Sequence, residues 1–116
     1  MTHIESLVAA MERHGLDTVQ RTWNGAKKPK TLQRLPVENL LRDAEAYLAE
    51  RGLDFALSLD TNSPWIAKWW AETDLGSESV GAAYEPDETT ARILAATAAL
   101  NALHEEAAGA AKGMGE

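Results

Sequence analysis

The spacing of the apolar residues changes after residue 52, and this change constrains the fold more than any other feature. In residues 37–48 the apolar side chains recur about every 3.6 positions, as on one face of a helix. In residues 53–60 they occur at every second position, as in a strand with one covered face. Two more segments rich in strand-forming residues follow, at 65–71 and 79–85, and turn-forming residues separate the three. We therefore expect three consecutive antiparallel strands.

Helices are expected on both sides of this strand region. Residues 2–15 begin with a Thr-x-x-Glu capping box, continue with an apolar stripe and end at a glycine. A second helix is expected from Pro36 to Gly52. The last helix is expected from about Pro86 to Ala108, and its many alanines allow a close approach to whatever it packs on.

Residues 17–25 are compatible with two interpretations. Asp17 can cap a short helix that ends at Asn24-Gly25, and the same dipeptide can be the turn of a β-hairpin. Pro29 would lie in the returning strand of such a hairpin, where it removes a backbone donor. We therefore favour the helix, followed by an irregular linker over residues 26–35.

These elements predict an α+β fold. It is a three-stranded antiparallel β-meander with N-terminal helices and a long C-terminal helix packed on it. Residues 1–108 are expected to form a single domain, and the glycine-rich residues 109–116 a flexible tail.

Three of the four tryptophans lie between residues 65 and 70. Strand alternation places Trp65 and Trp69 on one face of the sheet and Trp70 on the other. Alternation also assigns Val80, Ala82 and Tyr84 to one face of the third strand. Both faces of the second strand are therefore apolar, so either both are covered within the monomer or one is left for a partner. We expect two tryptophans in the core, with Trp69 or Trp70 free to contact a partner.

The charge is distributed unevenly along the chain, whose net charge is −7. Residues 1–35 hold six Lys and Arg against three acidic residues, whereas residues 36–116 hold five against fifteen. Such asymmetry is typical of a binding surface or of a solvated basic loop. The candidate contacts in the basic segment are Arg21, Trp23, Lys27, Lys28, Lys30 and Arg34. They would suit an acidic protein surface or a nucleic-acid backbone.

Signals for catalysis or metal binding are weak. The chain has no cysteine, which excludes disulfides and thiolate chemistry. The three histidines are far apart in the sequence, and no Gly-rich phosphate loop or nucleophile motif is present. We expect no enzyme activity, no cofactor and no metal. The chain shows no secretion signal and no membrane-spanning run, so we expect a cytoplasmic protein.

Three segments together resemble a known class of proteins: Phe55-Ala-Leu-Ser-Leu, Trp65-Ile-Ala-Lys-Trp-Trp, and Glu85-Pro-Asp-Glu-Thr-Thr-Ala-Arg-Ile-Leu-Ala-Ala. A strand meander that leads through a proline into an Ala-rich helix is similar to small bacteriophage accessory proteins, over about residues 53–103. That class includes inhibitors of host defence systems such as anti-CRISPR proteins. The resemblance implies an acidic phage protein that inhibits by protein–protein interaction, in the cytoplasm of the host cell. It assigns no functional residue.

The leading hypothesis is therefore a non-enzymatic protein-binding module that inhibits a host defence complex. One alternative is a nucleic-acid-binding accessory protein that uses residues 21–34. Another is a homo-oligomeric structural phage protein, possible as a homodimer through the second apolar face of the sheet. The residues leave open the partner's identity and the oligomeric state.

Overall fold

The computed structural model describes residues 2–22, 31–59, 65–73 and 76–114, and it describes their side chains except at 21–22, 31–32, 73 and 106–114. The elements in chain order are α1 (His3–Arg13), β1 (Val19–Thr22), β2 (Thr31–Arg34), α2 (Val37–Glu50), β3 (Asp54–Ser58), β4 (Trp65–Thr73), β5 (Gly76–Glu85) and α3 (Glu88–Met114). The α+β class is thus confirmed. α3 continues to Met114, beyond the expected end at Ala108. The flexibility expected for residues 109–116 stays a prediction.

The ends of α1 and α2 follow from local sequence signals. Thr2 accepts a hydrogen bond from the backbone N–H of Glu5 at 3.1 Å, which satisfies one free donor of the first turn of α1. Gly15 and Gly52 follow the two helices with φ of 75° and 87°, a backbone region that favours glycine. Beyond Gly52, the N–H of Leu53 returns to the carbonyl of Leu48 at 3.3 Å. Both expected helices are confirmed.

The strands β3, β4 and β5 form an antiparallel sheet in that order. A bulge interrupts the pairing of β4 with β5: Trp69 is opposite Gly81, whereas Trp70 is opposite Ser79. Val80 is the extra residue, and it packs against the core. The shared face expected for Val80, Ala82 and Tyr84 is therefore wrong for Val80, because a bulge changes the alternation that the expectation assumed.

A second sheet pairs β1 with β2, antiparallel, from Val19 opposite Arg34 to Thr22 opposite Thr31. The expected helix over residues 17–25 is wrong, and so is the linker for residues 31–34. The β-forming residues of β1 prevail over the possible helix cap at Asp17. The objection from Pro29 does not apply, because β2 begins after it. Pro29 and the Asn24-Gly25 turn lie outside the described residues.

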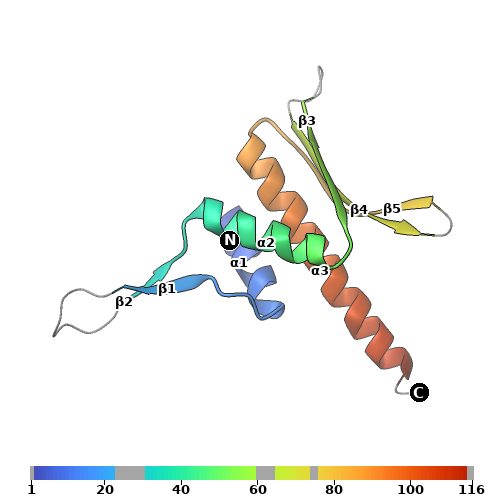
Figure 1. The fold of residues 1–116 in the computed structure, drawn as a ribbon, viewed down its shortest axis with the longest axis horizontal. Helices are drawn as coiled ribbons and strands as arrows, with labels where there is room; N and C mark the ends of the chain where they lie inside the picture. Colours follow the sequence, from blue (N-terminus) through green and yellow to red (C-terminus); the bar gives the residue numbers. More distant parts are fainter. Residues whose placement is uncertain (1, 23–30, 60–64, 74–75, 115–116) are drawn as a thin grey trace.

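Helix α3 is the centre of the fold. It packs on β4 and β5 on one side, while α1 and α2 pack on it from the other (Figure 1). The expectation that the N-terminal helices pack on the sheet is therefore wrong, because α3 lies between them and the sheet. The sequence of α3 explains this position, since its buried residues do not form a single stripe, and a helix that is apolar all round requires cover on more than one side. The buried apolar residues of α3 are Ala91, Ile93, Ala95, Ala96, Ala99 and Leu100, and Thr97 is buried among them.

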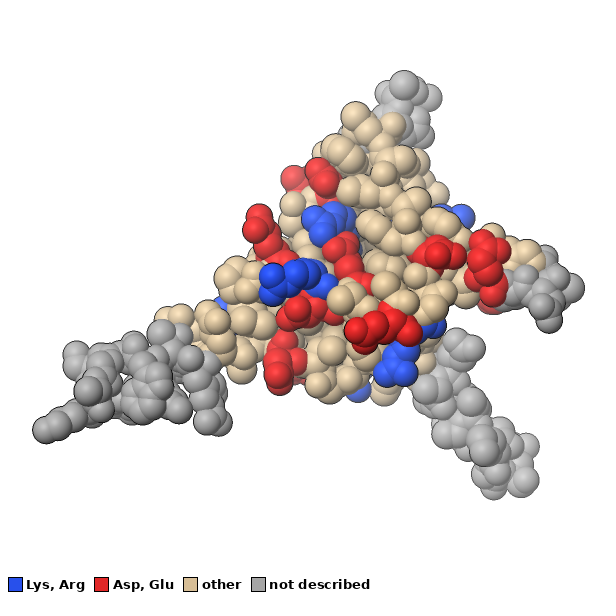
Figure 2. Space-filling view, in the orientation of Figure 1, with Lys and Arg blue, Asp and Glu red and all other residues tan. Residues whose placement is uncertain are grey.

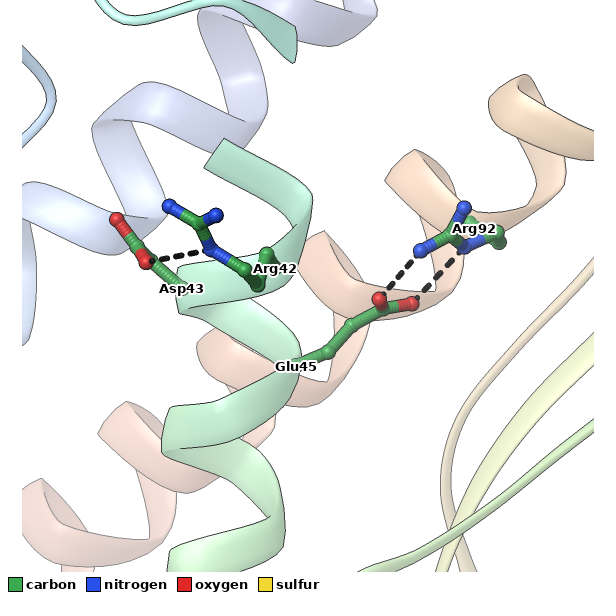
Figure 3. Close-up of polar contacts among 4 residues, drawn as sticks. All are labelled: Arg42, Asp43, Glu45 and Arg92. Carbon is green, nitrogen blue, oxygen red and sulfur yellow. Dashed lines mark hydrogen bonds and ion pairs between the residues drawn. The ribbon is translucent and has the colours of Figure 1, made fainter. Parts of the chain in front are cut away.

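On the face of the molecule drawn in Figure 2, acidic side chains are scattered among uncharged residues, with Lys and Arg side chains beside several of them. One ion pair links α2 to α3. Arg92 donates to both carboxylate oxygens of Glu45, from Nη2 at 2.6 Å and from Nε at 3.1 Å (Figure 3). The hydrogen bond to Glu45 raises the pKa of Arg92 above its ordinary value, although partial burial acts against it. The Arg42–Asp43 pair on α2 is longer, at 3.7 Å, and more exposed.

Candidate partner-binding surfaces

The two candidate tryptophans, adjacent in β4, lie on opposite faces of the sheet. Trp69 points toward α3, is only 2% exposed, and stacks on Phe55 with ring centroids 4.6 Å apart. Trp70 is half-buried on the other face, where its Nε1–H donates to Glu72 Oε1 at 3.1 Å. Trp69 therefore belongs to the core, and Trp70 is the member of the pair that a partner can reach.

The sheet face that carries Trp70, called here the outer face, lies opposite α3. No described helix packs on it (Figure 1). Its apolar members are the half-buried Ile66 and Trp70, the exposed Ala56 and Ala82, and Tyr84, which is 64% exposed. Ile66 and Tyr84 are direct cross-strand neighbours. The described part of the monomer thus leaves one apolar face of the sheet uncovered, which is the second of the two arrangements the strand pattern allowed.

Charged and polar groups surround the apolar members of the outer face. Lys68 lies at its centre, between Ala56 of β3 and Ala82 of β5. Asp54 is opposite Trp70, and Glu72 accepts hydrogen bonds from Trp70 and from Ser77 Oγ, the latter at 3.1 Å. An apolar centre with a polar rim is the usual composition of a protein–protein interface.

The described part of the basic segment lies at the other end of the molecule. The hairpin of β1 and β2 projects from the helices on the side away from β3, β4 and β5 (Figure 1). Arg21 is in β1 opposite Leu32, and Arg34 is exposed at the end of β2. The remaining candidates, Trp23, Lys27, Lys28 and Lys30, lie outside the described residues. The structure therefore does not bring Arg21 or Arg34 together with Trp70.

A groove beside the C-terminal half of α3 is a third candidate surface, and no sequence pattern predicts it. A cavity of about 590 Å³ opens between α3 and the β4–β5 hairpin, and Arg51 and Leu103 line both it and a neighbouring cavity of about 300 Å³. The other residues that line the larger cavity are Leu53, Ala71, Glu78, Ser79, Val80 and Ala102. The other residues that line the smaller cavity are His14 and Tyr47. Most residues that line the larger cavity are apolar, and Arg51 and Glu78 add one charge of each sign.

A chain of hydrogen bonds joins three elements at the edge of this groove. His14 Nε2 is 2.7 Å from the carbonyl oxygen of Leu100, which can only accept, so this nitrogen carries a proton. In the neutral ring Nδ1 is then the acceptor, and the Tyr47 hydroxyl donates to it at 3.0 Å. Arg51 Nη2 donates to the same hydroxyl at 2.8 Å, and its guanidinium lies 4.6 Å from the centre of the Tyr47 ring.

This arrangement fastens the end of α1 to α2 and α3, and it leaves neither nitrogen of His14 free to exchange a proton with a ligand. His104 lies beside it, with ring centroids 6.0 Å apart, although the two residues are distant in the sequence. The described residues contain no cluster of three metal-ligating side chains. The hydrogen-bonded group of His14, Tyr47 and Arg51 is thus a structural junction between helices. No local sequence signal could have predicted it.

In comparisons with known proteins, no protein-family model, no curated protein and no solved structure matches the chain. Among the described helices, none is long and apolar enough to cross a membrane.

Proposed function

We propose that this chain is a non-enzymatic protein-binding module that contacts its partner through the outer face of the sheet. The supporting observation is the uncovered patch of Ile66, Trp70 and Tyr84. Tryptophan and tyrosine are the residues that most often dominate the binding energy of protein interfaces. Burying them against a partner would remove from water an apolar area that the monomer leaves accessible.

We propose further that the chain belongs to the class that residues 53–103 resemble. It would be a phage-encoded inhibitor that binds a host defence complex in the host cytoplasm. A rigid sheet face supported by α3 can obstruct a larger assembly without any catalytic group. The basic segment 21–34 would supply a separate contact, since its hairpin projects from the opposite end of the molecule.

Affinity capture from a bacterial lysate with a set of variants tests the proposal. We expect wild-type protein to retain a partner that the Trp70→Ala/Tyr84→Ala variant loses. The matched control is Arg42→Ala, which removes an exposed side chain of α2 and should retain the partner. Circular dichroism of the three proteins checks that the fold is intact. Capture of the same proteins by wild type and by the double variant would contradict the outer face as the contact.

A nucleic-acid-binding function is the second candidate, and the β1–β2 hairpin favours it. A two-stranded ribbon fits the major groove of DNA, and the residues that connect this one include Trp23, Lys27, Lys28 and Lys30. If five cations contact phosphates of duplex DNA, log K should fall with log salt with a slope of about −4.5. Absence of DNA binding at low salt would reject this candidate. In that case, any effect of replacing the three lysines by glutamate would be an effect on protein binding.

A further inference from the structure

The outer edge of β3 is the second unpartnered feature of the sheet. β3 pairs only with β4, so within the described residues the backbone groups along its other edge have no strand beside them. Free edges of this kind add strands from other chains unless the sequence protects them. The opposite edge is protected, since β5 contains the Val80 bulge, carries Glu78 and Glu85, and lies against α3. β3 contains no lysine, no proline and no bulge.

The cover on the inner face also ends before β3. α3 packs on β5 and β4 and reaches little of β3. As a result Phe55 and Leu57 are only half-buried, although both point to the core side, and Leu59 just beyond the strand is 64% exposed. An apolar strip therefore runs along the same edge as the free backbone groups.

The sequence of β3 is symmetric in residue type about its centre. Asp54-Phe55-Ala56-Leu57-Ser58 reads polar, apolar, small, apolar, polar in either direction. This pattern suits a two-fold antiparallel pair, because each residue meets the residue at the mirrored position of the other copy and so meets one of its own type. We propose that β3 pairs with β3 of a second copy of this chain, with Ala56 on the two-fold axis, to form a dimer with a continuous six-stranded sheet.

The side chains agree with this register on the inner face. Phe55 would meet Leu57 of the second copy, so each half-buried side chain gains an apolar neighbour. The stack of Phe55 on Trp69 would then belong to an unbroken apolar row across both subunits. If the register continues by one residue, the exposed Leu59 lies opposite Leu53 of the second copy. A shift by one residue would bring polar side chains to the apolar face.

The outer face also fits, since no like charges become neighbours. Asp54 would lie opposite Ser58 of the second copy, whose hydroxyl can donate to the carboxylate. The two Lys68 side chains would be three strand spacings apart, about 14 Å, with Ala56 from each copy between them. That exceeds the screening length of about 8 Å at physiological salt. The dimer would also join the two outer faces into one surface.

Light scattering of the full chain from micromolar to millimolar concentration tests the dimer. A five-residue strand pair is a small interface, so we expect the average mass to rise with concentration from 12.6 kDa toward twice that value. Ala56→Lys would place two ammonium groups side by side on the axis and should hold the protein at the monomer mass. The matched control is Ala82→Lys, an exposed alanine on the other side of Lys68 in the same row, which should behave as wild type. A wild-type monomer at every concentration, or dissociation by Ala82→Lys and not by Ala56→Lys, would overturn the proposal.

The absence of cysteine allows a direct test of the register. Residues directly opposite in an antiparallel pair have Cα atoms about 4.5–5.5 Å apart, within the range that a disulfide spans. Ala56→Cys should therefore form a covalent dimer under mild oxidation, and Ala82→Cys should not. Equal cross-linking of the two variants would contradict pairing through β3. Neither experiment involves the partner proposed for the outer face, so the two proposals can fail separately.

Discussion

Gly81 of β5 lies directly against the backbone of Ala99 in α3. A Cβ atom at Gly81 would be 2.6 Å from the amide nitrogen of Ala99, and 2.7 Å from the carbonyl oxygen of Ala95. Real Cβ atoms do not approach other atoms so closely. The absence of a side chain at residue 81 therefore sets how near the sheet can come to the central helix.

Gly81→Ala should consequently destabilise the protein, by about 1–3 kcal/mol or more, because the helix must move away from the sheet. Urea unfolding measures the change. The Ala99→Gly replacement should not rescue it, since the obstacle is the main chain of α3. Restoration of wild-type stability in the double variant would show that the contact is made by side chains.

The two neighbouring tryptophans should differ in their importance for stability. Trp69→Ala removes a side chain that is only 2% exposed, so we expect a loss of about 3–5 kcal/mol in the free energy of unfolding. Trp70→Ala should change it by less than about 1 kcal/mol, because the outer face is already accessible to water. Denaturant unfolding of both variants makes the comparison, and equal losses would contradict the assignment of the two faces.

The chain's two tyrosines provide a matched test of the hydrogen bonds at His14. Tyr47→Phe leaves the part-buried Nδ1 of His14 without a donor and Arg51 without this acceptor, which should cost about 1–3 kcal/mol. Tyr84→Phe removes an exposed hydroxyl on the outer face and should cost less than about 0.5 kcal/mol. Thermal unfolding of the two variants at the same pH separates them.

The Glu45–Arg92 pair should contribute more than the Arg42–Asp43 pair. A double-mutant cycle with Glu45→Gln and Arg92→Met should give a coupling energy of about 1 kcal/mol, because the contact is two-pronged and partly buried. The cycle with Asp43→Asn and Arg42→Met should give nearly none, since that pair is long and exposed. Equal coupling in the two cycles would contradict this difference.

The raised pKa of Arg92 predicts how this coupling depends on alkaline pH. A base whose pKa is higher in the folded state than in the unfolded chain stabilises the fold fully at every pH below its unfolded value. The contribution is lost only as the pH rises through the still higher folded value. The coupling energy should therefore be the same at pH 7 and pH 10, because arginine is protonated at both in the folded and in the unfolded chain, and a decline between them would contradict the assignment.

The parts of the fold that depend on neighbouring residues could be predicted from the sequence. Thr2, Gly15 and Gly52 mark the ends of helices through their own backbone chemistry, and the two-residue alternation from residue 53 predicts β3. The separation of Trp69 from Trp70 also follows from alternation alone. Alternation does not predict which of the two tryptophans points toward α3, because that depends on the side of the sheet on which the helix packs.

The remaining features depend on contacts between distant residues. The bulge at Val80 and the position of α3 between two layers arise from packing, although the absence of a single apolar stripe in α3 already favoured cover on two sides. The sequence allows the β1–β2 hairpin as the alternative to a helix, and the helix is favoured only if Pro29 lies inside the returning strand, which in fact starts at Thr31. His14 and Tyr47 meet only after three helices assemble.

The central position of α3 has a consequence for synthesis on the ribosome. The sheet and the α1–α2 pair are both synthesised before the helix that covers them. The 2.8 Å hydrogen bond from Arg13 to Asn101, for example, can form only after 88 more residues have been added. Contacts between such distant residues slow folding. We therefore expect the nascent chain to expose apolar surface on both layers until α3 is released, and to depend during that interval on chaperones that bind unfolded chains.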